Sequence, residues 1–167
     1  MKSIKKFIIL IISLMVIGVI ASKVIIVLES DSLGANGRDI YNNEYKIVSE
    51  NDSYSYLRKK LKNEENNMNL KFVEFTGIDT AYNIESYKEG IITLQYETEI
   101  LKGEFKVLLI TPSNEIVNVL EGNNKGNNNI KISSGKSKIR IVGNKSTGNL
   151  KINITSSDDI DITISEL

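Results

Sequence analysis

The chain has 167 residues, of which 41% are hydrophobic and 25% are charged, and it contains no histidine, cysteine or tryptophan. Without imidazole or thiol groups, its own residues cannot build a Cys/His zinc site, a disulfide framework, a thiolate nucleophile or a Ser-His-Asp triad. The 21 basic and 21 acidic residues balance, which is not the basic footprint of a nucleic-acid-binding protein. We expect no cofactor and no nucleic-acid partner.

The N-terminal region predicts a membrane anchor over residues 1–28. Three lysines within the first six residues precede an apolar run from Phe7 to Leu28, which only Lys23 interrupts. A helix of that length, at ~1.5 Å per residue, is long enough to cross a hydrocarbon core of roughly 30 Å. Because basic residues stay in the cytoplasm, we expect a single-pass protein with a cytoplasmic N-terminus and an extracytoplasmic C-terminal domain. The alternative is a signal peptide cleaved after Ala21, which would give a secreted protein.

The charge balance conceals a difference between this anchor and the rest of the chain. Residues 1–28 hold four lysines and no acidic residue, which leaves 17 basic against 21 acidic residues in the remainder. The expected extracytoplasmic part is therefore mildly acidic. We divide it into a helical juxtamembrane segment with a linker, residues 29–69, and a β-sandwich domain, residues 70–167.

Residues 38–68 are predicted to form one broken helix or two short ones. Their apolar side chains recur at spacings of three and four, as on one helix face: Ile40, Tyr41, Tyr45, Val48, Tyr54, Leu57 and Leu61. Asp52 or Ser53 is the expected cap of the second piece. The basic run Arg58–Lys62 is interpreted as a solvated helix face, with a site for anionic envelope polymers or phospholipid head groups as the alternative. This segment is also the candidate surface for a membrane-protein partner.

From residue 70 onward the apolar period changes to two, which predicts an antiparallel β-sandwich of about eight strands. The expected strands are 70–76, 80–86, 91–99, 103–111, 115–120, 129–133, 137–142 and 148–155, with an added edge strand at Ile160, Ile162 and Ile164. Turn signals separate them and no helical period remains, which favours a sandwich or barrel over βαβ units. Pro112 predicts a tight hairpin between Val107 and Val117.

The order of strands and turns from Gly90 to Ile154 resembles the jelly-roll modules of the bacterial pre-peptidase C-terminal type, with IKISSGKSKIRIVGNKSTGNLKINI as its ending. The whole chain, with FTGIDTAY from Phe75 to Tyr82 after an anchor and a helical segment, also resembles small membrane-anchored clostridial proteins of unknown function. The first resemblance implies a non-catalytic module that accompanies secreted enzymes or binds envelope or matrix material. The second implies an extracytoplasmic location.

Tyrosines are the candidate ligand-binding residues, because the chain has no tryptophan to stack on a sugar ring. Tyr82, Tyr87 and Tyr96 fall in the early strands, and Tyr82 and Tyr87 would form a platform if they shared an exposed face. The alternative is that Tyr82 and Tyr96 pack in the core with Phe75. The asparagine-rich run from residue 122 to 129 is predicted to be a long hairpin connection, with display of its amides to a polar ligand as the alternative.

Two acidic clusters complete the candidate sites. Asp158, Asp159 and Asp161 offer hard oxygen ligands for calcium, or else cap an edge strand with charge so that it does not pair with other chains. Glu97 and Glu99 share the wet face of one strand, where carboxylates usually serve solubility; a glycosidase-like pair is the alternative.

These patterns predict a non-enzymatic, membrane-anchored extracytoplasmic protein whose β-sandwich is a binding or structural module at the cell envelope. A cell-wall polymer or glycan is the candidate ligand. The alternatives are a secreted carbohydrate-binding or enzyme-accessory module, a small carboxylate hydrolase, and a subunit of a membrane complex.

Overall fold

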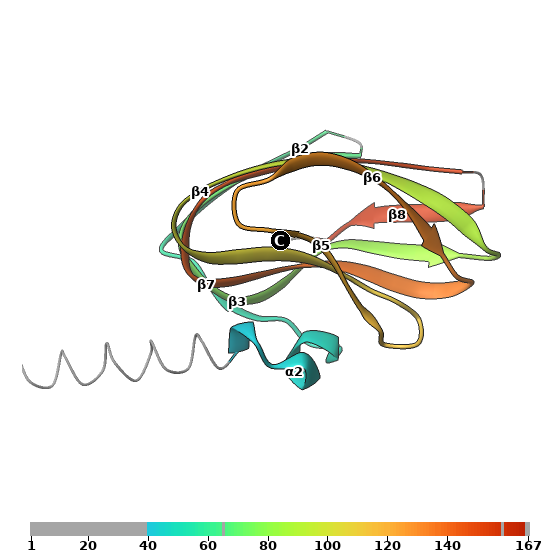
Figure 1. The fold of residues 1–167 in the computed structure, drawn as a ribbon, viewed down its shortest axis with the longest axis horizontal. Helices are drawn as coiled ribbons and strands as arrows, with labels where there is room; N and C mark the ends of the chain where they lie inside the picture. Colours follow the sequence, from blue (N-terminus) through green and yellow to red (C-terminus); the bar gives the residue numbers. More distant parts are fainter. Residues whose placement is uncertain (1–39, 65, 158, 166–167) are drawn as a thin grey trace, which may run out of the picture. The chain divides into compact units, whose positions relative to one another are not determined.

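The computed structural model describes residues 40–64, 66–157 and 159–165, which fall within one compact unit, residues 37–167 (Figure 1). Its helix and strands are α2 (Glu44–Val48), β1 (Ser53–Ser55), β2 (Arg58–Glu64), β3 (Asn67–Ser86), β4 (Gly90–Ile110), β5 (Ile116–Glu121), β6 (Lys125–Ile132), β7 (Gly135–Ser156) and β8 (Ile160–Ile164). The eight strands form one antiparallel sheet, so the predicted mainly-β antiparallel fold is confirmed.

The predicted anchor, residues 1–28, lies outside the described residues. Within the described part of the chain, no helix has the length and apolar character needed to span a membrane.

Three long strands, β3, β7 and β4, run side by side through the middle of the sheet and bend so that it folds over on itself (Figure 1). The first layer contains β2, the first half of β3, the second half of β7, the first half of β4, and β6. The second layer contains β1 and β8, the other halves of the three long strands, and β5. Each long strand thus contributes to both layers.

The bends lie where the sequence pattern predicted breaks between strands, so two predicted strands often form one observed strand. Segments 70–76 and 80–86 are the two halves of β3, for example. Gly103 lies at the bend of β4 with φ +75°, and a Cβ there would overlap the backbone of Asn144 and Lys145. The register shifts on both sides of Lys102 identify a bulge, which redirects a strand without reversing it. The hairpin at Pro112 is confirmed, because Leu109 pairs with Val117.

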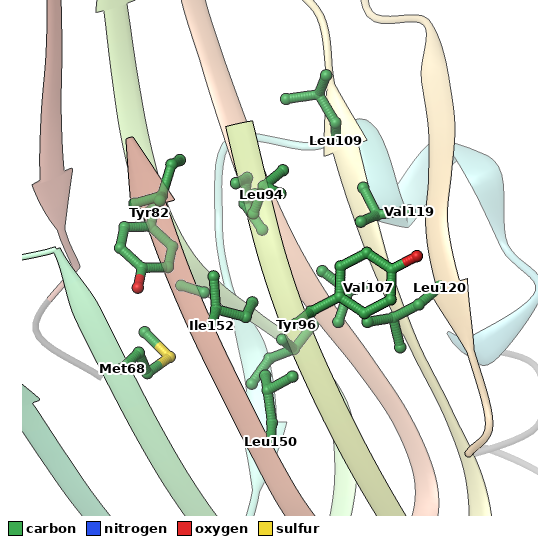
Figure 2. Packing of buried hydrophobic residues seen from close by; sticks show 14 of the residues in the cluster. Met68, Tyr82, Leu94, Tyr96, Val107, Leu109, Val119, Leu120, Leu150 and Ile152 are labelled. Carbon is green, nitrogen blue, oxygen red and sulfur yellow. The ribbon is translucent and has the colours of Figure 1, made fainter. Parts of the chain in front are cut away.

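The main core lies between the layers and consists of the inward-facing aliphatic and aromatic side chains of both. Phe72 and Phe105 stack there with ring centroids 4.9 Å apart, and the ring of Phe75 meets Phe105 edge-on. Figure 2 shows Tyr82 and Tyr96 among the aliphatic side chains of this core. The alternation of the strands therefore supplies the apolar burial that holds the two layers together.

The prediction of helix over residues 38–68 is wrong beyond Val48. Residues 58–64 form β2, in which Leu61 packs against the core while Lys60 and Lys62 face solvent. β2 pairs with β3, whose backbone groups would otherwise lie unpaired at a sheet edge. The apolar residues that recur every three or four positions in this segment therefore belong to separate elements and not to one helix face. Tyr45 is 84% exposed and Leu57 68%, but Leu61 is partly buried, so no continuous apolar stripe forms.

Residues 40–52, which we call the strap, cover the outer face of the second layer. Tyr41 and Ile47 of the strap pack on outward-facing apolar residues of the sheet: Ile78, Leu108, Ile110 and Val142. Asn43 caps α2 by accepting a hydrogen bond from the Lys46 backbone N–H, at 3.1 Å. This second, smaller core closes one outer face of the protein.

Arg140 fixes the strap from within the sheet, with no exposed surface of its own. Its guanidinium donates to the Ile47 carbonyl at 2.6 Å, to Asp52 Oδ1 at 2.9 Å and to Thr80 Oγ1 at 3.3 Å. Burial lowers the pKa of Arg140, and the nearby Asp52 carboxylate acts in the opposite direction. Asp52 is therefore a partner of this network and not the helix cap that the sequence predicted.

Candidate functional site

The outer face of the first layer is open and carries a groove of about 670 Å³. The groove crosses β2, β3, β7, β4 and β6, and its lining includes two rows of outward-facing polar residues. These positions alternate with inward-facing core residues such as Met68 and Ile152, which is why the polar side chains all lie on one face. The strand register aligns them.

The first row, which we call the charged row, consists of side chains that lie opposite one another on five neighbouring strands: Lys62, Asn69, Lys151, Glu97 and Lys125. The second row, the amide row, lies one same-face step along the strands: Glu64, Asn67, Asn153, Gln95 and Asn127. Adjacent strands are ~4.8 Å apart, so each row is about 19 Å long. An extended ligand would have contacts along that whole length.

Each lysine of the charged row has a carboxylate partner. Glu97 Oε2 lies 3.4 Å from Lys151 Nζ and 3.7 Å from Lys125 Nζ. Lys62 Nζ lies 2.7 Å from Glu64 Oε1, and this hydrogen-bonded pair raises the pKa of Lys62 and lowers that of Glu64. The groove thus presents charges that are already compensated, next to neutral amides.

The amide row supplies both donors and acceptors. Asn153 donates from Nδ2 to Asn67 Oδ1 at 2.5 Å, which orients both amides along the row. Side-chain amides carry a carbonyl oxygen and an NH₂ group, and so match hydroxyl groups that donate and accept at once. Within the two rows, the outward-facing positions hold no aromatic ring. The groove therefore suits hydrogen bonding to hydroxyls and lacks a stacking platform in these rows.

The structure does not bring the three candidate tyrosines together. Tyr82 is completely buried in the core, where burial raises the pKa of its hydroxyl. Tyr87 is 69% exposed and lies away from the groove, with its hydroxyl donating to Asp161 at 3.3 Å. Tyr96 contributes to the groove lining, but only 9% of it is exposed and its hydroxyl accepts from Asn128. Tyr82 and Tyr87 accordingly do not form a shared platform.

The described carboxylates of the two acidic clusters form ion pairs or hydrogen bonds with neighbouring side chains. Asp159 lies 2.5 Å from Lys88 and Asp161 accepts from Tyr87, while Asp158 lies outside the described residues. Glu99 accepts from Asn149 at 3.2 Å, beside Glu97 and its two lysines. Among the described residues, no three His, Cys, Asp or Glu side chains lie together in a way that could hold a metal ion.

The asparagine-rich run contains one of the parts of the site that the sequence interpretation missed. Its second half is not a loop, because Lys125–Ile132 form β6 and place Asn127 in the amide row. The signal was present as a period of two: Ile130 and Ile132 face inward, and continuing their alternation backward places Asn129 and Asn127 outward. The low hydrophobicity of this segment made the strand pattern hard to recognise, since only one face of this edge strand is apolar.

No protein-family model and no curated protein match this chain. Solved structures that it resembles include a family 29 carbohydrate-binding module, a CBM29-2 mutant complexed with mannohexaose, at 12% identity over 64% of this chain and 79% of that one, TM-score 0.36. BiXyn10A CBM1 is 11% identical over 72% and 95%, and the enzymatically active domain of bacteriophage CBA120 tailspike protein 4 is 8% identical over 75% and 21%, both with a TM-score of 0.37. Likeness at this level assigns neither family nor ligand, so the functional argument rests on the groove.

Proposed function

We propose that this protein is a non-catalytic glycan-binding module of the cell envelope, with the groove of the first layer as its binding site. The observation that carries the proposal is the alignment of ten polar side chains from five adjacent strands in two rows beside one groove. Hydroxyl-rich chains are extended and polar, and the amide row offers them donors and acceptors along about 19 Å.

A binding role fits this groove better than a catalytic one. A hydrolase with two carboxylates needs one that is protonated and one that is free to act on the substrate or on water. Glu97 is held between Lys125 and Lys151, and Glu64 is bound to Lys62. Charges neutralised in this way favour a surface that binds its ligand without transforming it.

We further propose that the N-terminal segment anchors this module on the outer side of the cytoplasmic membrane. The apolar run from Phe7 to Leu28 and the lysines before it support this location. A cleaved signal peptide would place the same module outside the cell without an anchor.

The binding proposal is tested with full-length protein in detergent and a panel of insoluble peptidoglycan, mannan and cellulose oligosaccharides. We expect Gln95→Ala combined with Asn153→Ala to weaken binding at least tenfold, since each lost hydrogen bond is worth about 1 kcal/mol. The matched control is Asn83→Ala with Asn118→Ala, two exposed asparagines of the second layer. Equal loss of binding in both double variants would overturn the proposal.

The location is tested by fractionating cells and sizing the mature chain. Full-length protein in the membrane pellet is the expected result. A soluble product that begins near Ser22 contradicts the anchor and supports the secreted alternative.

A further inference from the structure

Beside the groove, the same outer face carries a second hollow of about 600 Å³, whose lining includes Arg58, Lys60, Lys71 and the exposed Leu101. We call it the basic hollow. Lys60 and Lys71 lie one same-face step, ~7 Å, along β2 and β3 from Lys62 and Asn69 of the charged row. The groove and the basic hollow are therefore neighbouring sections of one surface.

The positions of the cations in the basic hollow lower the stability of the fold. Lys60 and Lys71 are directly opposite each other in the register of β2 and β3, and like charges in that position destabilise a sheet. Arg58 adds a third positive charge on the same face of β2, two residues from Lys60.

In the part of the chain that the structure describes, none of these three cations has a carboxylate partner, whereas every lysine of the charged row has one. A fourth cation of the lining, Lys59, is paired with the buried Asp79 at 3.3 Å. The sequence therefore concentrates uncompensated positive charge here, although the chain has a net charge of zero. Such a concentration calls for an anion that the protein itself does not supply.

We propose that the basic hollow binds acidic groups of the same ligand that occupies the groove, and hence that this ligand is an anionic glycan bearing phosphate or carboxylate groups. This inference rests on the proposed function and names its ligand class. Arginine offers two parallel N–H donors to a phosphate or carboxylate, and the lysines add point charges beside it. Leu101, which is 71% exposed, adds apolar surface beside these cations.

The shape of the surface favours a chain ligand over a membrane. The basic hollow is a depression that is followed along the same strands by the groove, and both together offer contacts to a polymer lying along the face. A bilayer surface is flat on this scale and would meet the rims of the depression without filling it. A preference for anionic over neutral vesicles is accordingly an outcome that would contradict the proposal.

The experiment compares matched probes that differ only in acidic groups. One pair is polygalacturonate and its methyl ester; the other is Gram-positive sacculi before and after hydrofluoric acid has removed their phosphodiester polymer. We expect full-length protein to bind at least one acidic probe about tenfold more tightly than its neutral counterpart at roughly 50 mM salt, with the difference lost near 500 mM. The pair that shows the difference identifies carboxylate or phosphate as the preferred group.

The decisive variant is Lys60→Gln with Lys71→Gln, which should reduce binding of the acidic probe to the level of the neutral one and leave neutral binding unchanged. The matched control is Lys131→Gln with Lys136→Gln, two exposed lysines outside both hollows, and it should change neither.

Equal binding of acidic and neutral probes overturns the anionic ligand but leaves the glycan proposal intact, whereas binding of neither overturns the proposed function. Tighter binding to phosphatidylglycerol vesicles than to neutral phosphatidylcholine vesicles, lost in Lys60→Gln with Lys71→Gln, would assign the basic hollow to the membrane instead.

Discussion

The two outer faces of the folded sheet differ in what their outward positions carry. In the second layer these positions include Ile78, Leu108 and Val142, and the strap covers them. In the first layer the equivalent positions are amides, lysines and glutamates, and they remain open as the groove. The same alternation along the same three long strands thus builds a closed face and an open one. A face needs a cover where its outward residues are apolar and is free to bind a ligand where they are polar.

The largest effect is expected from breaking the closed face at Arg140. Replacing it with alanine removes a fully buried cation and leaves the Ile47 carbonyl without its partner. It also takes one hydrogen bond each from the Thr80 hydroxyl and the Asp52 carboxylate, which still bond to each other. We expect Arg140→Ala to lower the free energy of unfolding by about 3–5 kcal/mol, measured by urea denaturation.

The control for this variant is Lys138→Ala, which removes a cation that pairs with the exposed Glu50 of the strap at 2.9 Å. An exposed pair contributes little, so this loss should be much smaller. Equal destabilisation by both variants would show that Arg140 acts only through its charge and not through its buried hydrogen bonds.

A smaller effect is expected from loosening the strap itself. Ile47 is 2% exposed and packs on the apolar outward residues of the second layer. Ile47→Ala should cost about 2–4 kcal/mol and increase the fluorescence of a hydrophobic dye, because the closed face becomes accessible. Tyr45→Ala is the control, since Tyr45 lies on the same helix but is 84% exposed. Unchanged dye binding in Ile47→Ala would contradict the role of the strap as a cover.

A pH-dependent effect is expected where the chain passes from the strap to the first layer. There the buried Asp79 accepts from the Tyr56 hydroxyl at 2.7 Å and from Lys59 Nζ at 3.3 Å. Burial raises the pKa of Asp79 above its usual value near 3.8, although both partners act in the opposite direction. The folded state thus holds this proton more tightly than the unfolded state does, so the contribution of Asp79 to stability falls as pH rises from about 4 through the raised pKa.

Asp79→Asn cannot titrate and provides the reference for this effect. The free energy of unfolding of the wild-type protein minus that of the variant should be largest near pH 4 and decrease toward neutral pH, in urea titrations across that range. A difference that grows with pH would mean that Lys59 and Tyr56 outweigh the burial of the carboxylate.

The sequence predicted the alternation of most strands because inward positions such as Leu94 and Ile152 are apolar. It did not predict the bends, since Gly103 carries the same local signal whether a strand reverses or folds into the other layer. β2 was read as helix because its pairing with β3 is a tertiary contact that local spacing does not encode. The groove was missed for a related reason: its residues are separated along the chain, and only strand register aligns Asn67, Asn153 and Gln95.

The smallest effect on stability is expected from a substitution on the open face, and it is an increase. Lys71→Gln removes the like-charge opposition to Lys60, so the thermal midpoint should rise by about 1 °C. The same variant should weaken binding of an acidic glycan, because it removes one of the cations of the basic hollow. Lys131→Gln, on the same face but outside that hollow, should change neither quantity. A variant that is more stable but binds the glycan more weakly would show that these lysines are retained for binding. A fall in the thermal midpoint would show that Lys71 stabilises the sheet.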